Sequence, residues 1–147
     1  MSDARASDLR ALACRLPGLR DDWFRYLSDI EQLPRWAAGF CSGLELARGR
    51  WLAYTLGGDV FAEIEADERS GTIDLRWGEE GGAVRLLPLR LVALPGGQCL
   101  LSAVCHRDPG QDDLSFEREV AALFHALEGL GENGLTGIHS PCRRLAV

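Results

Sequence analysis

Residues 40–107 read FCSGLELARGRWLAYTLGGDVFAEIEADERSGTIDLRWGEEGGAVRLLPLRLVALPGGQCLLSAVCHR. Glycine-bearing turns divide this stretch into six runs, and the turns lie at residues 48–49, 57–58, 68–71, 79–82 and 96–97. When the runs are paired through these turns as antiparallel strands, apolar residues gather on one face and charged residues on the other. A slip of one residue would move every side chain to the opposite face, so the agreement among the turns predicts an antiparallel meander in this register.

The predicted register gives the sheet an apolar inner face. Its large apolar members are Phe40, Leu44, Leu46, Trp51, Val60, Ile64, Ile73, Leu75, Trp77, Val84, Leu86, Val92 and Leu101. Alanines lie between them, and three polar residues share the face: Ser42, Thr55 and Arg90. In this register Arg90 faces Ala103 across the last turn. The composition of this face indicates a sheet that folds around something apolar.

The outer face is expected to be charged, with an apolar share. Its charged members are Glu45, Glu63, Glu65, Asp74, Arg76 and Arg85. Its apolar members are Tyr54, Phe61, Leu87, Leu89, Leu91 and Val104. A solvated sheet face usually needs less apolar surface than this, so a homodimer through the outer face is one expectation.

A strand and two short helices are expected before the meander. Residues 9–16 alternate enough for a short first strand, and a helix with one apolar stripe follows Pro17. Because Pro34 interrupts that stripe, residues 31–38 form at most a second short helix.

A long helix is expected after the meander. It begins with Asp112 or Asp113 as its cap, carries one apolar stripe and ends at about Leu130. Its stripe requires it to lie on the inner face of the sheet. Residues 131–147 lack periodicity and are expected to form a loosely ordered tail, which leaves 1–130 as a single α+β domain.

Composition excludes several classes of function. The chain has 147 residues and a net charge of -6, which disfavours nucleic acid as a partner, because such affinity depends on Lys and Arg neutralising phosphates. All 16 basic residues are arginine. The chain therefore lacks a lysine for a Schiff base or a pyridoxal-phosphate anchor, and we expect no cofactor.

The cysteines and the ends of the chain bear on location. The 5 cysteines are scattered, and neither they nor the 3 histidines have the spacing of a zinc site, so no metal is expected. We expect reduced thiols in a cytoplasmic protein. The N-terminus lacks the apolar core of a signal peptide, and no uncharged run approaches the ~20 residues that span a bilayer, so membrane insertion is not expected.

Short stretches of the chain are similar to the START-like superfamily, also called SRPBCC. Residues 26–36 resemble its helix, acidic loop and Pro-x-Trp passage. Residues 71–75 and 88–92 resemble strands of its bacterial polyketide-cyclase-like members, and 112–116 resembles the entry to their last helix. The resemblance covers 9–130 and implies a helix-grip fold. In that fold a seven-stranded antiparallel sheet curls around a long C-terminal helix, with two short helices after the first strand.

The resemblance also implies a cavity between the sheet and the last helix. In that superfamily the cavity holds lipids, sterols, polyketides or other apolar ligands. Our leading hypothesis is therefore that the protein binds a small apolar or amphipathic ligand there: a lipid, a polyketide or an aromatic molecule. One alternative is a polyketide cyclase/dehydratase-like enzyme that uses the same cavity. A second is a protein-interaction module with a filled core that works through the outer sheet face.

Arg90 is the leading candidate for a ligand contact. A guanidinium on an apolar face needs a partner, and the polar end of a ligand would supply one. The alternative is an internal ion pair with a helix residue such as Glu117 or Glu119. Ser42 and Thr55 are expected to offer hydroxyls to the ligand, or else to bond each other or nearby backbone.

Aromatic residues are the other candidates for the cavity lining. They are Tyr26, Trp36, Trp51, Trp77 and Phe116. The alternative for the tryptophans is core packing. The histidines are expected to be solvated, and the inner sheet face offers no Asp, Glu or His for general acid–base catalysis. Tyr26, or a water held by Arg90, would have to serve a cyclase, so the pattern favours binding over catalysis.

Overall fold

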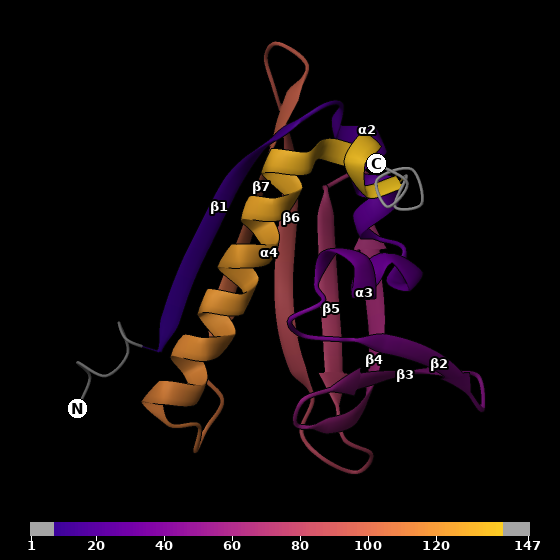
Figure 1. Ribbon diagram of the computed structural model, residues 1–147, viewed down its shortest axis with the longest axis vertical. Helices are drawn as coiled ribbons and strands as arrows, with labels where there is room; N and C mark the ends of the chain where they lie inside the picture. Colours follow the sequence, from indigo (N-terminus) through magenta and orange to yellow (C-terminus); the bar gives the residue numbers. More distant parts are fainter. Residues whose placement is uncertain (1–7, 140–147) are drawn as a thin grey trace.

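The structure is a computed structural model that describes residues 8–139, and its helices all lie on one face of a single sheet (Figure 1). The strands are β1 (Leu9–Pro17), β2 (Gly43–Ala47), β3 (Arg50–Thr55), β4 (Gly58–Asp67), β5 (Thr72–Gly78), β6 (Arg85–Leu94) and β7 (Gln98–His106). The helices are α2 (Arg20–Leu27), the 3-10 helix η1 (Ile30–Gln32), α3 (Leu33–Trp36) and α4 (Asp113–His139). The expected α+β class and element order are confirmed.

The sheet has seven antiparallel strands in the order β1-β7-β6-β5-β4-β3-β2. The first strand pairs with the last, Leu9 opposite His106 and Pro17 opposite Gln98. The remaining strands follow one another as a meander. This arrangement, with a long C-terminal helix on the sheet, is the predicted helix-grip fold.

The register agrees with the prediction in two hairpins and keeps the predicted faces in a third. Leu44 lies opposite Ala53 across β2–β3, where Arg48 (φ 55) and Gly49 (φ 76) make the tight turn. Ile64 lies opposite Leu75 across β4–β5. The β3–β4 pairing differs by two residues, because the turn comes one residue earlier than expected, and a shift of two leaves every side chain on its predicted face.

Strand β6 is turned over relative to the prediction. Leu75 faces Leu87 instead of Leu86, and Ala103 faces Leu89 instead of Arg90. The β5–β6 register and the β6–β7 register each differ from the prediction by one residue, in opposite directions. The two differences cancel, so the side chains of β7 lie on their predicted faces. The inward residues of β6 include Leu87, Leu89 and Leu91, and all three are buried, whereas Arg90 is exposed on the outer face. The predicted inward placement of Arg90 is therefore wrong.

The loops around β6 explain the difference. The chain leaves β5 at Gly78 and enters β6 at Arg85, so the connection is longer than the four-residue turn at 79–82. The turn into β7 has three residues, because Leu94 faces Gln98. In addition, β6 is apolar on both faces, so its own sequence pattern does not identify the inner one.

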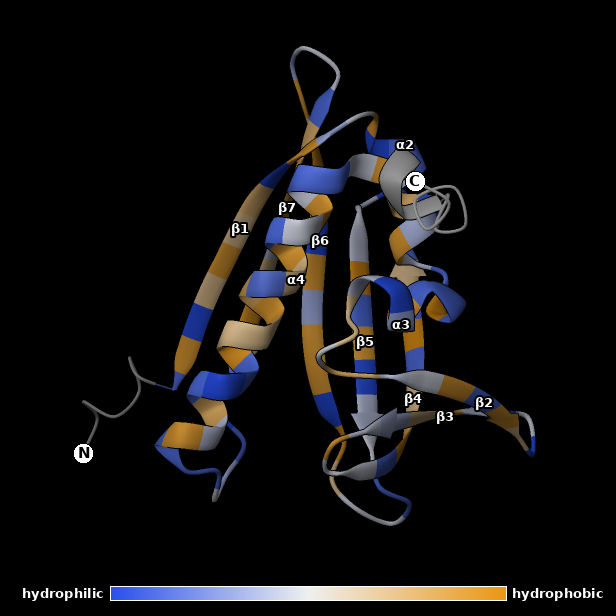
Figure 2. Cartoon of the chain, in the orientation of Figure 1, coloured by the Kyte–Doolittle hydropathy of each residue, from blue (hydrophilic) through white to orange (hydrophobic). Residues whose placement is uncertain are grey.

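The inner face packs against α2 and α4. Trp23, Tyr26 and Leu27 of α2 are buried, and the indole N–H of Trp23 donates to the Pro17 carbonyl at 2.7 Å. In Figure 2 the visible turns of α4 alternate between apolar and polar residues, as expected of a helix with one face on a core. Its buried residues include Phe116 and Leu127.

Helix α4 continues beyond the predicted end at Leu130. Its range is Asp113–His139, with a break at Gly134, which has φ 66 and ψ 177. The first residues of the predicted tail are thus helical, and its remainder, 140–147, lies outside the described residues. Among residues 8–139, no helix is long and apolar enough to cross a membrane.

Candidate functional site

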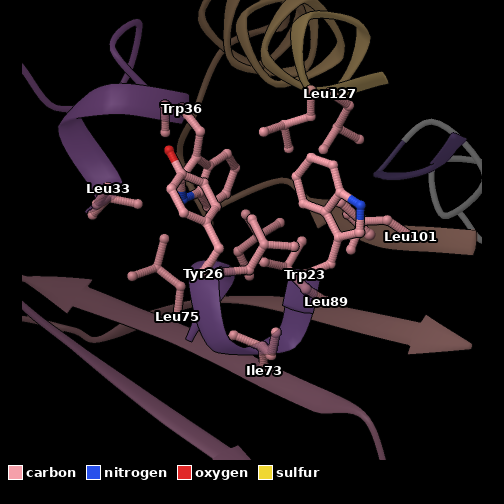
Figure 3. Packing of buried hydrophobic residues seen from close by; sticks show 14 of the residues in the cluster. Trp23, Tyr26, Leu33, Trp36, Ile73, Leu75, Leu89, Leu101 and Leu127 are labelled. Carbon is pink, nitrogen blue, oxygen red and sulfur yellow. The ribbon is translucent and has the colours of Figure 1, made fainter. Parts of the chain in front are cut away.

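The space between the sheet and the helices, where the ligand cavity was expected, is filled by side chains. Figure 3 shows Trp23, Tyr26 and Trp36 packed between residues of the sheet and Leu127 of α4. The exposed fractions of the three aromatic side chains are 0%, 3% and 6%. This packing forms a continuous hydrophobic core, so a ligand site has to be sought at its margin.

A groove lies at that margin, between α3 with the segment that follows it and α4. Its volume is about 390 Å³, within the range of small-molecule sites. The described residues that line it are Arg35, Trp36, Ala38, Gly39, Ala122, His125, Ala126, Gly129, Leu130 and Asn133. We call this the α3–α4 groove. The sheet contributes none of these residues.

The local sequence of α3 explains how its wall of the groove forms. Asp29 caps the preceding 3-10 turn by accepting from the Glu31 amide at 3.1 Å. Pro34 occupies the first turn of α3, a position where its missing N–H costs little. Leu33 and Trp36, three residues apart, both face the core, and this anchoring leaves Arg35 exposed at the groove.

Small residues keep the groove open. A Cβ atom placed on Gly129 would have the Asn133 Nδ2 atom, at 4.0 Å, as its nearest neighbour, so there is room for a side chain at this position. At Gly39 a Cβ atom would lie 3.4 Å from the Ala122 Cβ atom, which shows how closely the segment after α3 approaches α4. The apolar share of the wall comes from Trp36 and Leu130, which are 6% and 2% exposed.

The groove also carries polar groups. Arg35 and His125 line it from opposite helices, and both side chains are exposed. The indole Nε1 of Trp36 is buried and has no hydrogen-bond partner. Because this atom is buried, it is not part of the groove surface that a bound molecule would contact.

A second hollow lies among strands β3, β4 and β5 near the end of the sheet. Its volume is about 190 Å³, below the usual range of ligand pockets. Trp51 and Trp77 both line it. Trp77 also makes an edge-to-face contact with Phe40, with 5.2 Å between ring centroids, which ties this tryptophan to the core.

The inner face does carry arginines, but Arg90 is not one of them. Arg10 of β1 pairs with Glu117 of α4. The second is Arg85 of β6. Its guanidinium donates to both carboxylate oxygens of Glu119 on α4, at 2.7 and 3.2 Å. It also lies 5.3 Å from the centroid of the Trp77 ring. The ion pair with Glu119 that was considered for Arg90 is therefore made by Arg85, which was expected to face outward.

Metal ligands are not gathered anywhere in the described structure. Among residues 8–135, whose side chains are described, no three side chains of His, Cys, Asp or Glu come close enough to hold a metal ion. Cys14, Cys41, Cys99 and Cys105 are free thiols.

Comparison with solved structures identifies the fold. A START superfamily protein from Mycobacterium smegmatis superposes with a TM-score of 0.59 at 17% identity, over 84% of this chain and 97% of that one. The chain has the helix-grip fold of START-like proteins. No protein-family model and no curated protein matches its sequence.

Two enzymes share this START-like fold. The di-domain ARO/CYC BexL of the BE-7585A biosynthetic pathway matches with a TM-score of 0.62 at 15% identity, over 85% of this chain and 45% of that one. Norcoclaurine synthase from Thalictrum flavum, in complex with dopamine and hydroxybenzaldehyde, matches with a TM-score of 0.57 at 14% identity, over 83% and 84%. At such identities the likeness shows the fold alone.

Most of the predicted site residues lie away from the α3–α4 groove. Of the eight, Trp36 lines it, and Trp51 and Trp77 line the smaller hollow. The remaining five, namely Arg90, Ser42, Thr55, Tyr26 and Phe116, line neither.

The hydroxyl groups and Phe116 have other partners. Ser42 Oγ donates to the Tyr54 carbonyl at 3.3 Å, and Thr55 Oγ1 donates to the Gly58 carbonyl at 2.5 Å, which is the backbone alternative. Phe116 is fully buried. The guanidinium carbons of Arg10 and Arg107 lie 5.6 and 4.8 Å from its ring centroid.

Three polar residues of the groove were missed by sequence reasoning: Arg35, His125 and Asn133. The sequence pattern correctly placed His125 on the polar face of α4. Because this face lies opposite the apolar stripe, His125 was expected to contact only solvent. The available signal was weak, because helical periodicity separates buried from exposed positions and does not show which exposed positions face another helix.

Proposed function

We propose that this protein binds a small apolar or amphipathic ligand in the α3–α4 groove. The observation that carries the proposal is a groove of about 390 Å³ that combines buried Trp36 and Leu130 with small residues. Sites for small molecules are commonly concave, mostly apolar and supplied with a few polar groups. The complex of a structural neighbour with dopamine and hydroxybenzaldehyde adds support, because it shows small aromatic molecules held by this fold.

A groove-filling substitution tests the proposal. Gly129→Leu should occupy the groove without a clash, because the nearest atom to a Cβ at this position is 4.0 Å away. It should also keep or raise stability, since leucine is favoured over glycine in helices by about 0.5–1 kcal/mol. With 2-naphthol as the probe, calorimetry should show binding to the parent protein and a loss of about tenfold or more in Gly129→Leu.

Ala121→Leu is the matched control. Ala121 is exposed on α4 and is not among the residues that line the groove. This variant should bind the probe as the parent protein does. Equal binding by Gly129→Leu and the parent protein, or no binding by any variant, would contradict the proposal.

An enzyme remains the second candidate, because His125 lines the groove. An imidazole is a common general acid or base, a type of group that the inner sheet face lacks. A polyketide cyclase/dehydratase-like reaction would use this group. Mass spectrometry of any compound that co-purifies with the protein would detect cyclisation or loss of water, and His125→Gln should stop that change while retaining the compound.

The outer sheet face supports a third candidate, a protein-interaction module. The core is filled, and Val92 and Val104 are exposed on the outer face at 37% and 39%. A homodimer through this face stays a prediction. The free thiols are consistent with our proposal that the protein works in the cytoplasm, where cysteines stay reduced.

A further inference from the structure

The charge of the α3–α4 groove is opposite to that of the whole chain. The chain has 22 acidic residues and a net charge of -6. Nevertheless, no described residue that lines the groove is Asp or Glu, and the groups that can carry charge there are Arg35 and His125. A local positive potential in an acidic protein favours an anionic guest over a neutral or cationic one.

Arg35 is available to such a guest. Other arginines use their guanidinium groups within the fold: Arg76 pairs with Glu65, and Arg85 pairs with Glu119. Arg35 forms no hydrogen bond or ion pair with any residue of the described chain. A guanidinium presents paired donors whose geometry matches a carboxylate, and it remains charged at every physiological pH.

The opposite wall adds a further polar group. His125 lies on α4, across the groove from Arg35, and its ring can donate a hydrogen bond in either protonation state. Trp36, next to Arg35 in the chain, lines the groove with its ring. The apolar part of the same groove comes from Trp36, Ala126 and Leu130. Positive and apolar surfaces thus adjoin within one hollow.

We infer that the α3–α4 groove accepts a small aromatic or alkyl carboxylate. The carboxylate lies between Arg35 and His125, and the apolar part packs against Trp36, Ala126 and Leu130. This inference rests on the proposed function, since it names the chemical class of the ligand for the same groove. One arginine and one histidine suit a single negative charge.

A charged and a neutral probe of nearly the same shape test the inference. The probes are 2-naphthoate and 2-naphthamide, which have the same rings and nearly the same shape, and binding is measured by calorimetry at pH 7. The parent protein should bind the carboxylate about fivefold more tightly than the amide, the size expected of a partly solvated ion pair. In Arg35→Gln this preference should disappear.

Arg90→Gln is the matched control. Arg90 is also an exposed arginine without an ion pair in the described chain. It lies on the outer sheet face and does not line the groove. The preference for the carboxylate should persist in this variant. Arg35→Lys, which keeps a charge but loses the paired donors, should retain part of the preference and exclude a loss of folding as the cause.

The outcomes separate the inference from the proposed function. If the parent protein binds both probes equally and Gly129→Leu abolishes both, the groove is a ligand site and the inference is wrong. A preference that survives Arg35→Gln also contradicts it. If neither probe binds, the proposed function fails and the inference falls with it.

Discussion

Arg85 brings a positive charge beneath α4, onto the mainly apolar inner face of the sheet. Its side chain is 16% exposed, whereas that of Glu119 is 42% exposed. The Nε atom of Arg85 is buried and lacks a hydrogen-bond partner. The cost of this partial burial is offset by the bidentate pair with Glu119 and by the Trp77 ring, so the guanidinium depends on its partners.

We predict that Glu119→Gln lowers the free energy of unfolding by about 1 kcal/mol, because it leaves the Arg85 guanidinium without its closest carboxylate. Glu128→Gln is the control, since Glu128 is exposed on the same helix and has no ion pair within the described chain. Urea unfolding of both variants measures the difference. Equal effects would show that the pair adds nothing to stability.

We predict that the free energy of unfolding falls at alkaline pH because of Cys14. Burial, with a smaller contribution from Cys99, raises the pKa of the Cys14 thiol from 9.0 to about 11. The unfolded chain therefore releases this proton first. The contribution to stability is complete below pH 9 and is lost as the pH rises towards 11.

The loss from Cys14 should be no more than about 1 kcal/mol, because solvent screens a half-buried group. Urea unfolding at pH 8 and at pH 10.5 measures it in the parent protein and in Cys14→Ala. The variant should show the shallower decline with pH. Identical declines would assign the alkaline loss to other groups.

At the scale of elements, the β4–β5 turn requires glycine at position 71 more strictly than other turns require theirs. Gly71 ends the β4–β5 turn with φ +77, and a Cβ atom there would lie 2.3 Å from the Leu91 carbonyl oxygen. The Leu91 amide in turn donates to the Gly71 carbonyl at 2.8 Å. The turn between β4 and β5 is thus also part of the packing of β6.

We predict that Gly71→Ala lowers the free energy of unfolding by about 2–4 kcal/mol, the sum of a left-handed backbone strain and a displaced neighbouring strand. Gly96→Ala is the control. Gly96 has φ +85 but nothing within 4 Å of the added atom, so this variant should cost about 1 kcal/mol. Thermal or urea unfolding distinguishes them, and a Gly71 variant no less stable than the Gly96 variant would refute the argument.

The elements themselves were largely predictable from the sequence. Alternation of apolar and polar residues predicts the pairing of Leu44 with Ala53 and of Ile64 with Leu75. Helical periodicity predicts the apolar stripe of α4. Strand β6 could not be placed, because Leu86 and Leu87 are equally apolar and only the loop lengths decide which of them faces inward. An error of one residue there exchanged the roles of arginines 85 and 90.

The groove was less predictable than the elements that form it. Arg35 and His125 lie on helices that are 90 positions apart in the chain, and their proximity follows from tertiary packing. The sequence pattern identified Trp36 as a candidate because it is a large aromatic residue. No pattern in the sequence marked Arg35 or His125 as residues of a binding site.

At the scale of the whole molecule, turning β6 over changes the expected self-association. Leu87, Leu89 and Leu91 belong to the core, so the outer face keeps Val92 and Val104 as its exposed large apolar residues on β6 and β7. A stable interface commonly buries about 800 Å² on each partner. We predict that any homodimer through this face is weak.

Sedimentation at micromolar concentration should therefore give a monomer, with association only at higher concentration. Val104→Glu should abolish that association, because it places a charge in the apolar part of the face. Ala121→Glu, an exposed change on α4 and so on the other side of the sheet, should leave it unchanged. A dimer that persists at nanomolar concentration would contradict the prediction.

The position of β1 beside β7 also bears on how the chain acquires its shape during synthesis. Each strand of the meander can pair with the one made just before it, whereas Leu9–Pro17 must wait for Gln98–His106. Strand β1 thus leaves the ribosome before the meander but is among the last of these strands to find its neighbour, and α4 follows later still. Until then the nascent chain carries an uncovered apolar face, which is the period when chaperones would be needed most.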